Sequence, residues 1–320
     1  MIAGRRSVMM GVGALALGAT SVEAQDDFPG KPITLICPWP AGGGADQHMR
    51  VLAQAASKHL KQPIHVDNRA GGAGVSAPAQ MAATAKPDGY TIGQIVLTVF
   101  RAPYTTKVTY DPLKDFTYIA LVGGFLIGAF VKNDSAIRSL PEFLAFARHN
   151  PGKATYGTPG VGTTNHLSLE QVALKAGVRL THVPFRGEAE MYAAVVGSHV
   201  MAGGGAGALV DAGELRWINT FGTGRPERWP GVPTARELGF DVVAQSPYGI
   251  AGPKGMDPRV VRILNDAIAT GLREPEHIAF LKRNAQPELY LDSAAYTREA
   301  AETFRREGEI LKSLGLARKE

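Results

Sequence analysis

Short apolar runs alternate with longer amphipathic stretches along most of the chain. Residues 33–37 are β-branched or apolar and stand between two prolines, which predicts a buried strand that is too short for a helix. In 49–60 the apolar residues return every three or four positions, which predicts a helix with one buried stripe. Further strands are expected at 63–68 and 90–97. Strands that alternate with helices through short glycine and proline turns indicate a parallel sheet covered on both faces.

The same alternation continues towards the end of the chain. Strands are expected at 117–122, 125–131, 154–156, 179–184, 197–202, 217–221 and 246–253, and helices at 139–149, 164–175, 258–273, 274–285 and 293–314. We expect the chain to cross into a second domain near 125–131 and to return to the first domain near 246–253. The expected domains are 25–126 plus 248–320 for the first and 127–247 for the second.

The residues that follow the third expected strand are candidates for ligand contact. Residues 98–101 are expected to close this strand at its carboxyl end, where open α/β sheets bind ligands. Thr98 offers a hydroxyl at this place. Arg101 is interpreted as a partner in a surface ion pair in preference to a partner of a ligand carboxylate.

Two glycine-rich turns each stand between an expected strand and an expected helix. The first is Pro38-Trp39-Pro40-Ala41-Gly42-Gly43-Gly44-Ala45-Asp46, and the second is Gly157-Thr158-Pro159-Gly160-Val161-Gly162-Thr163-Thr164-Asn165-His166. Glycine lets backbone N–H groups approach a ligand closely, and the unpaired N–H groups at a helix start carry partial positive charge. We therefore expect both turns to bind an anion. The alternative for the first turn is an ordinary connection in which Asp46 caps the helix.

The first 24 residues have the layout of an export signal. Arg5 and Arg6 precede an apolar run at 8–19, and a small-x-small site ends at Ala24. A membrane-spanning helix would need about 20 apolar residues, which this run does not reach. The remaining chain is long enough for two domains with cores of their own. We expect a protein that is exported to the periplasm.

Charge and cysteine content narrow the class of partner. The net charge of +5 is small for 320 residues and dispersed, which argues against nucleic acid as a partner but would not repel an anion. The single cysteine, Cys37, excludes an internal disulfide and is interpreted as a packed apolar residue.

The motifs of several enzyme classes are absent from the sequence. There is no G-x-x-x-x-G-K-[ST] loop, no H-E-x-x-H and no paired-cysteine spacing, so neither a nucleotide cofactor nor a metal is expected. The histidines are scattered, and no nucleophile, base and orienting group can be assembled from them. One enzymatic alternative stays open: an exported hydrolase or lyase that uses Asp46 and His166 as acid and base.

Several motifs together resemble one family of receptors. The segments 38–46, 66–71, 87–91, 110–116, 156–163, 182–187 and 232–234 resemble, in order, motifs of the Bug family, which are the periplasmic solute receptors of tripartite tricarboxylate transporters. The resemblance implies a two-domain periplasmic binding protein, a type II-like Venus flytrap in which each domain is a mostly parallel sheet flanked by helices. It also implies that two βα loops hold a small organic mono- or dicarboxylate between the domains, without a cofactor.

Carried onto this sequence, the resemblance implies two walls around the ligand. One wall would contain Trp39, Ala41, Gly42, Gly43 and Asp46, and the other Thr158, Gly160, Gly162, Thr163, Asn165 and His166. The chain departs from the common family pattern at Trp39, at Arg186 and at the glycines 203–207, and these departures bear on the identity of the ligand. Phe185, Arg186 and Gly204 are further candidates for ligand contact. Trp39, Phe185 and Tyr248 are candidates for apolar walls, and an aromatic ligand is one option. The implied partners are membrane subunits of a transporter or a sensor kinase, and a monomer is expected.

Overall fold

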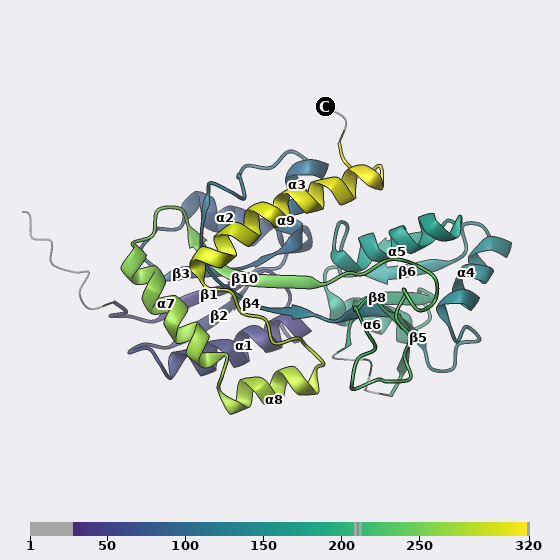
Figure 1. Ribbon diagram of the computed structural model, residues 1–320, viewed down its shortest axis with the longest axis horizontal. Helices are drawn as coiled ribbons and strands as arrows, with labels where there is room; N and C mark the ends of the chain where they lie inside the picture. The colour runs from purple at the N-terminus through teal and green to yellow at the C-terminus, as the bar shows by residue number, and fades with distance from the viewer. Residues whose placement is uncertain (1–27, 208–209, 211–212, 319–320) are drawn as a thin grey trace, which may run out of the picture.

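The molecule consists of two α/β lobes that lie side by side (Figure 1). The computed structural model describes residues 28–207, 210 and 213–318, so the predicted export signal at 1–24 lies outside the described residues. Each lobe contains one five-stranded sheet with helices packed on it. The predicted two-domain α/β fold is confirmed.

The first sheet has the strand order β2-β1-β3-β10-β4. Its strands are β1 (Ile33–Cys37), β2 (Ile64–Asn68), β3 (Thr91–Val96), β4 (Phe116–Phe125) and β10 (Ser246–Pro253), and its helices are α1 (Gly44–Ser57), the 3₁₀ turn η1 (Gly72–Gly74), α2 (Ser76–Thr84), α3 (Leu97–Thr105), α7 (Pro258–Gly271), α8 (Pro275–Arg283) and α9 (Ser293–Ser313). All strands run parallel except β10, which is antiparallel to both of its neighbours.

The second sheet has the order β7-β6-β8-β5-β9. Its strands are β5 (Ile127–Lys132), β6 (Thr155–Thr158), β7 (Thr181–Pro184), β8 (Ala202–Ala206) and β9 (Leu215–Thr220), and its helices are α4 (Leu140–His149), α5 (Thr164–Ala176) and α6 (Glu188–Val196). Here β5 is the antiparallel strand. Both sheets thus combine a parallel set with one reversed strand.

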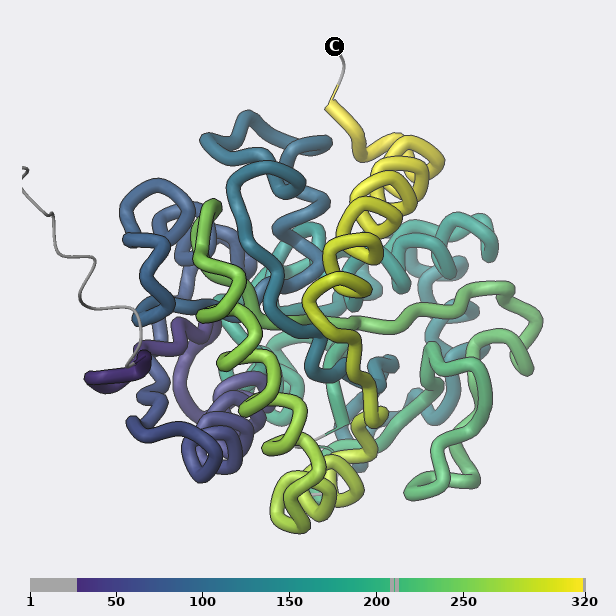
Figure 2. Tube along the Cα trace, turned by 60° about the vertical axis from the view of Figure 1, so that its left-hand side comes forward, coloured from purple at the N-terminus to yellow at the C-terminus, as the bar shows by residue number. Residues whose placement is uncertain are grey.

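The chain crosses between the lobes through two extended connections. The first is the direct step from β4 into β5, and the second leads back through β10, which pairs with β3 and β4. The C-terminal helices then cover the first lobe, where α9 lies along α3 (Figure 2). Two extended connections side by side form a hinge about which lobes of this kind can close.

The periodicity of the sequence explains the best-defined elements. In α1 the predicted stripe of Met49, Leu52, Ala53 and Ala56 is buried against the first sheet and α7. Helix α4 begins as expected, because the Ser139 hydroxyl accepts the N–H of Glu142. Such elements need only local pattern and a cap to be recognised.

Two sequence expectations are wrong. Residues 98–101 do not end a strand but belong to α3, whose first six residues are all buried, so that no polar face reveals the helix. The expected strand at 197–202 is displaced, and the glycines themselves form β8. A Cβ on Gly203 would lie 2.4 Å from Cε2 of Phe130, so this strand needs glycine for close packing rather than for a turn.

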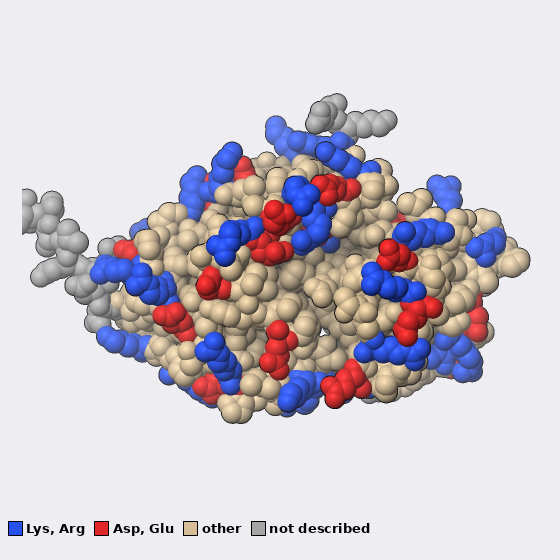
Figure 3. Space-filling model, viewed as in Figure 1, with Lys and Arg blue, Asp and Glu red and all other residues tan. Residues whose placement is uncertain are grey.

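Neither a membrane-spanning helix nor a one-sided charge pattern is seen in the described residues on the view shown in Figure 3. No helix in the described part of the chain combines the length and apolar character needed to cross a membrane. On the face shown in Figure 3, basic and acidic side chains are interspersed rather than gathered into a stripe of one sign.

Candidate functional site

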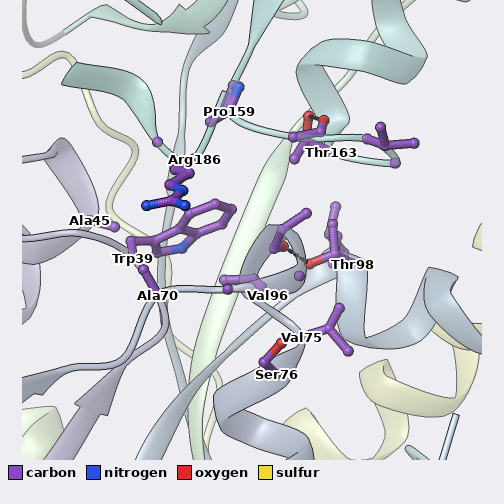
Figure 4. Close-up of a pocket in the computed structure, with 18 of the residues that line it drawn as sticks. Trp39, Ala45, Ala70, Val75, Ser76, Val96, Thr98, Pro159, Thr163 and Arg186 are labelled. Carbon is purple, nitrogen blue, oxygen red and sulfur yellow. Dashed lines mark hydrogen bonds between the residues drawn. The ribbon is translucent and has the colours of Figure 1, made fainter. Parts of the chain in front are cut away.

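A cleft of about 1460 Å³ lies between the two lobes. Its walls come from the β1–α1 loop, the residues around η1 and the start of α3 in the first lobe, and from the β6–α5 and β7–α6 loops in the second (Figure 4). Apolar side chains such as Trp39, Val75, Val96 and Phe185 form much of the surface, with a few hydroxyls and charges between them. This composition suits an organic ligand with an apolar skeleton and one or two polar ends.

The first glycine loop is held in place by Asp46. Its carboxylate accepts the N–H of Gly42 at 2.9 Å and the side-chain amide of Asn68 at 2.9 Å, and it forms an ion pair with Arg50. Burial alone would raise the pKa of Asp46, but the hydrogen bonds from Arg50, Gly42 and Asn68 hold this pKa below its ordinary value. Asp46 is 3% exposed and does not line the cleft, so it supports the loop from behind.

The second glycine loop is held by His166 in the same way. The N–H of Gly162 donates to Nδ1 of His166 at 3.1 Å, which leaves the ring proton on Nε2. Thr163 caps α5, since its hydroxyl accepts the N–H of His166 and donates to the carbonyl of Gly160. Burial, and next the charge of Arg101, lower the pKa of His166 to about 4, so the ring is neutral at physiological pH.

His182 and Thr158 form a layer behind this loop. The hydroxyl of Thr158 donates to the carbonyl of Gly160 at 3.0 Å, so Nε2 of His182, 2.7 Å away, is the donor to that hydroxyl. The rings of His182 and His166 stack with centroids 4.1 Å apart. Both residues therefore position the loop.

Arg101 links the two lobes and is not the surface residue that its sequence context suggests. It is 4% exposed; its Nε donates to Glu307 at 2.7 Å, and its Nη1 donates to the carbonyl of Gly162 at 2.9 Å and to the hydroxyl of Thr164 at 3.1 Å. Helices α3 and α9 of the first lobe thus place a buried ion pair against the second glycine loop, and Arg101 also lines the cleft.

Tyr248 lies at the base of the cleft and belongs to a buried chain of hydrogen bonds. Nδ1 of His277 donates to the carbonyl of Leu272 at 3.0 Å, so its Nε2 accepts from Nε2 of His48 at 2.7 Å. His48 then accepts the hydroxyl of Tyr248 at Nδ1. This chain fixes β10, α1 and α8 relative to one another.

The cleft brings together ten of the fifteen predicted contact residues. These are Trp39, Ala41, Gly43, Thr98, Gly160, Gly162, Thr163, Asn165, Phe185 and Arg186. The hydroxyl of Thr98 donates to the carbonyl of Ala73 at 2.7 Å (Figure 4), whereas Oδ1 of Asn165 has no hydrogen-bond partner among the described residues.

The other five predicted residues do not line the cleft. They are Gly42, Asp46, Thr158, His166 and Gly204. The first four maintain the shape of the glycine loops through the hydrogen bonds given above. Gly204 lies inside β8, where a Cβ would be 2.9 Å from Leu169. The structure places these five outside the cleft lining, and for Asp46 and His166 the reason is that a side chain in the first turn of a helix can turn back to the loop instead of outward.

Sequence reasoning missed several cleft residues. The turn at 70–76 contributes Ala70, Gly71, Gly72, Ala73, Val75 and Ser76 to the wall. Its glycines were a usable signal, because the turn follows β2 at the same edge of the sheet as the first loop. Glu188 was also missed, since nothing local in the sequence places the first residue of α6 in the cleft.

Comparison with known proteins places the chain in a family. Residues 48–316 match the model of the tripartite tricarboxylate transporter family receptor. The chain belongs to this family. Among its relatives, a UPF0065 protein from the gbd 5' region of Cupriavidus necator is 42% identical over 98% of this chain and 97% of its own length. The protein BugT of Bordetella pertussis is 28% identical over 89% of this chain and 90% of its own length.

Solved structures agree with this membership. A protein of R. palustris, Rpa4515, solved with adipate, has a TM-score of 0.86 and 26% identity and covers 91% of this chain and 99% of its own. The periplasmic binding protein BugD shares the fold with a TM-score of 0.86 at 24% identity, covering 91% of this chain and 100% of its own. The family and fold are those of periplasmic solute-binding receptors, not of enzymes.

The arrangement gives no support to the hydrolase alternative. Asp46 and His166, its acid and base, are both engaged by backbone N–H groups and lie behind the cleft wall. Within the described ranges, no three histidine, cysteine, aspartate or glutamate side chains are grouped so that they could hold a metal ion.

Proposed function

We propose that this chain is a periplasmic receptor that captures a small organic carboxylate between its lobes and delivers it to the membrane subunits of a tripartite tricarboxylate-type transporter. The observation that carries the proposal is the second glycine loop. It presents the N-terminus of α5 to the cleft, and Arg101, which donates to this loop, lines the cleft beside it. A helix N-terminus favours a nearby anion by about 0.3–1 kcal/mol, or more when partly buried, and Arg101 adds a positive charge that Glu307 partly offsets.

The wall of the cleft supports an organic rather than an inorganic anion. Trp39, Val75, Val96 and Phe185 would contact a carbon skeleton, either aliphatic or aromatic. The adipate-bound neighbour is one example of such a ligand in a receptor of this fold.

Movement of the two lobes would signal that a ligand has bound. We propose that residues 25–126 with 248–320 move as one body and residues 127–247 as the other, about the connections that contain β10 and the β4–β5 step. A ligand that contacts both bodies stabilises the closed state, which a transporter or a sensor kinase can recognise.

Thermal unfolding with a library of small carboxylates tests the proposal. A ligand at 100 times its Kd adds roughly 2.7 kcal/mol to the free energy of unfolding, and so raises the Tm by several degrees. Each acid that gives a shift is repeated as its uncharged amide, which should give none. Stabilisation by amines, cations or sugars alone would contradict the proposal, and native mass spectrometry of the purified protein would identify any ligand that copurifies.

A further inference from the structure

Glu188, at the start of α6, lines the cleft from the second lobe. Its Oε1 accepts the N–H of Ala206 at 3.0 Å. Gly44, the first residue of α1 in the other lobe, lines the same cleft, and its N–H lowers the pKa of this carboxyl. A carboxylate of the protein itself therefore faces the N-terminus of α1.

Two close contacts between the lobes fix this arrangement. A Cβ on Gly187 would lie 3.0 Å from Cδ of Pro40, so the β7–α6 loop packs directly on the first glycine loop. A Cβ on Gly160 would lie 2.7 Å from Cβ of Ala73, so the second glycine loop packs on the turn at η1. The position of Glu188 over α1 thus follows from the contact between the lobes and not from a long side chain reaching across open space.

The two ends of the cleft differ in charge as a result. At the α5 end there is a helix N-terminus, with Arg101 beside it. At the α1 end the helix N-terminus already faces Glu188. Arg186 also lines the cleft beside Trp39, as Figure 4 shows, but its side chain is exposed and water screens its charge more than that of the partly buried Glu188.

We propose that Glu188 makes this receptor selective for monocarboxylates over dicarboxylates of the same chain length. This inference rests on the proposed function, and it narrows the ligand class of the same cleft. The single carboxylate of the ligand lies at the α5 loop, and the far end, which is neutral or carries a hydrogen-bond donor, points towards Glu188. A second carboxylate at that end would meet the charge of Glu188, which already uses the N-terminus of α1.

The inference requires Glu188 to be ionised when ligand binds. Burial holds the pKa of Glu188 above its ordinary value, although the N–H groups of Ala206 and Gly44 act in the opposite direction. The other titratable or charged groups around it are Arg186, Glu190, Tyr192 and Tyr248. Binding is therefore measured over a pH series from about 6 to 9, and the preference for the monocarboxylate should grow as Glu188 ionises.

Calorimetric titration of matched acids tests the inference. Hexanoate is compared with adipate and butyrate with succinate, on the wild-type protein and on Glu188→Gln, which keeps a side-chain oxygen as acceptor for Ala206. In the wild type, the monocarboxylate of each pair should bind about 10-fold more tightly, since like charges roughly 6 Å apart repel by about 1.4 kcal/mol at an effective dielectric constant near 40. In Glu188→Gln the adipate and succinate affinities should rise by about that factor, with hexanoate and butyrate little changed.

Two further variants keep the test decisive. Glu188→Asp retains the charge and should retain the preference, even if its stability differs. Glu276→Gln removes one charge from the exposed end of α8, far from the cleft, and should leave both affinities unchanged. Tighter binding of dicarboxylates by the wild type, or an unchanged ratio in Glu188→Gln, would overturn the selectivity while leaving carboxylate capture intact. Failure of these acids and of the whole carboxylate library to bind any variant would overturn the proposed function as well.

Discussion

The two glycine loops share one construction and differ in charge. In each, a glycine N–H donates to a side chain four residues later, in the first turn of the following helix: Gly42 to Asp46 and Gly162 to His166. The first loop therefore contains an ionised carboxylate, partly neutralised by Arg50, and the second a neutral imidazole. The charge of such a glycine loop thus depends on which side chain accepts its glycine N–H.

The residues beyond each loop increase this difference. Arg101 donates to the second loop, whereas Glu188 faces the helix that follows the first. Backbone geometry alone would give the cleft two equivalent anion sites. We propose that the side chains leave one, at the start of α5, and this asymmetry carries the proposals above.

The largest effect is expected from Arg101→Met. It leaves the carboxylate of Glu307 buried without its cation, and loss of one partner of a buried ion pair costs about 3–5 kcal/mol. Arg50→Met is the matched change at the first loop, where the arginine side chain is 51% exposed, and should cost no more than about 1 kcal/mol. Urea unfolding measures both, and equal costs would contradict the distinction between the loops.

The next effect concerns ligand affinity. Gly160→Ala combines a φ of +134° with a Cβ that would lie 2.7 Å from Ala73, so it strains the contact between the second loop and the turn at η1 by about 1–3 kcal/mol and should weaken carboxylate binding about 10- to 100-fold. Gly43→Ala places its Cβ 3.7 Å from the nearest atom and should change affinity less than about three-fold. Calorimetric titration distinguishes them. A larger loss for Gly43→Ala would place the carboxylate at the first loop.

The two loops should respond differently to a fall in pH, because His166 and Asp46, which hold them, have different pKa values. The pKa of His166 is lowered to about 4, so its contribution to stability is complete above the unfolded value near 6.5 and is lost as pH falls towards 4. Between about pH 7 and 5 this loss is about 2 kcal/mol. In His166→Gln the free energy of unfolding should fall less steeply between these pH values than in the wild type.

Asp46 provides the control for this pH dependence, because its pKa lies below the pH range of the measurement. Its pKa is lowered from 3.8, so its contribution is present above that value and is lost only as pH falls through the still lower folded pKa. Asp46→Asn should therefore leave the slope of stability between about pH 7 and 5 unchanged. An equal change of slope in Asp46→Asn and His166→Gln would show that the two loops are not distinguished by these groups.

The smallest effect concerns the cap of α5. Thr163→Ala removes the hydroxyl that accepts the N–H of His166 and should cost about 1 kcal/mol, whereas Thr163→Ser should cost little. Helix α1 begins after Gly43 without any side-chain cap, so no corresponding change exists in the first loop. Thermal unfolding of the two variants makes the comparison, and equal losses would show that the methyl group matters more than the hydroxyl.

The sequence supports prediction where a local pattern decides the structure. The stripe of α1, the cap of α4 and the strand β1 are examples, and the position of the first glycine loop follows from β1 and α1. The missed features depend on distant partners. Arg101 meets Glu307 206 residues further along the chain, and β8 needs its glycines because Phe130 packs on it. Glu188 faces α1 only because the two lobes meet, and no spacing within one lobe encodes that contact.

A crystal structure of the protein with hexanoate would test the central claim most directly. We predict that the hexanoate carboxylate lies against the N–H groups at the start of α5, in the loop of Gly160 and Thr163, and that Glu188 remains at the start of α1. A carboxylate bound at the start of α1 with Glu188 displaced, or a ligand outside the cleft between the lobes, would contradict the account.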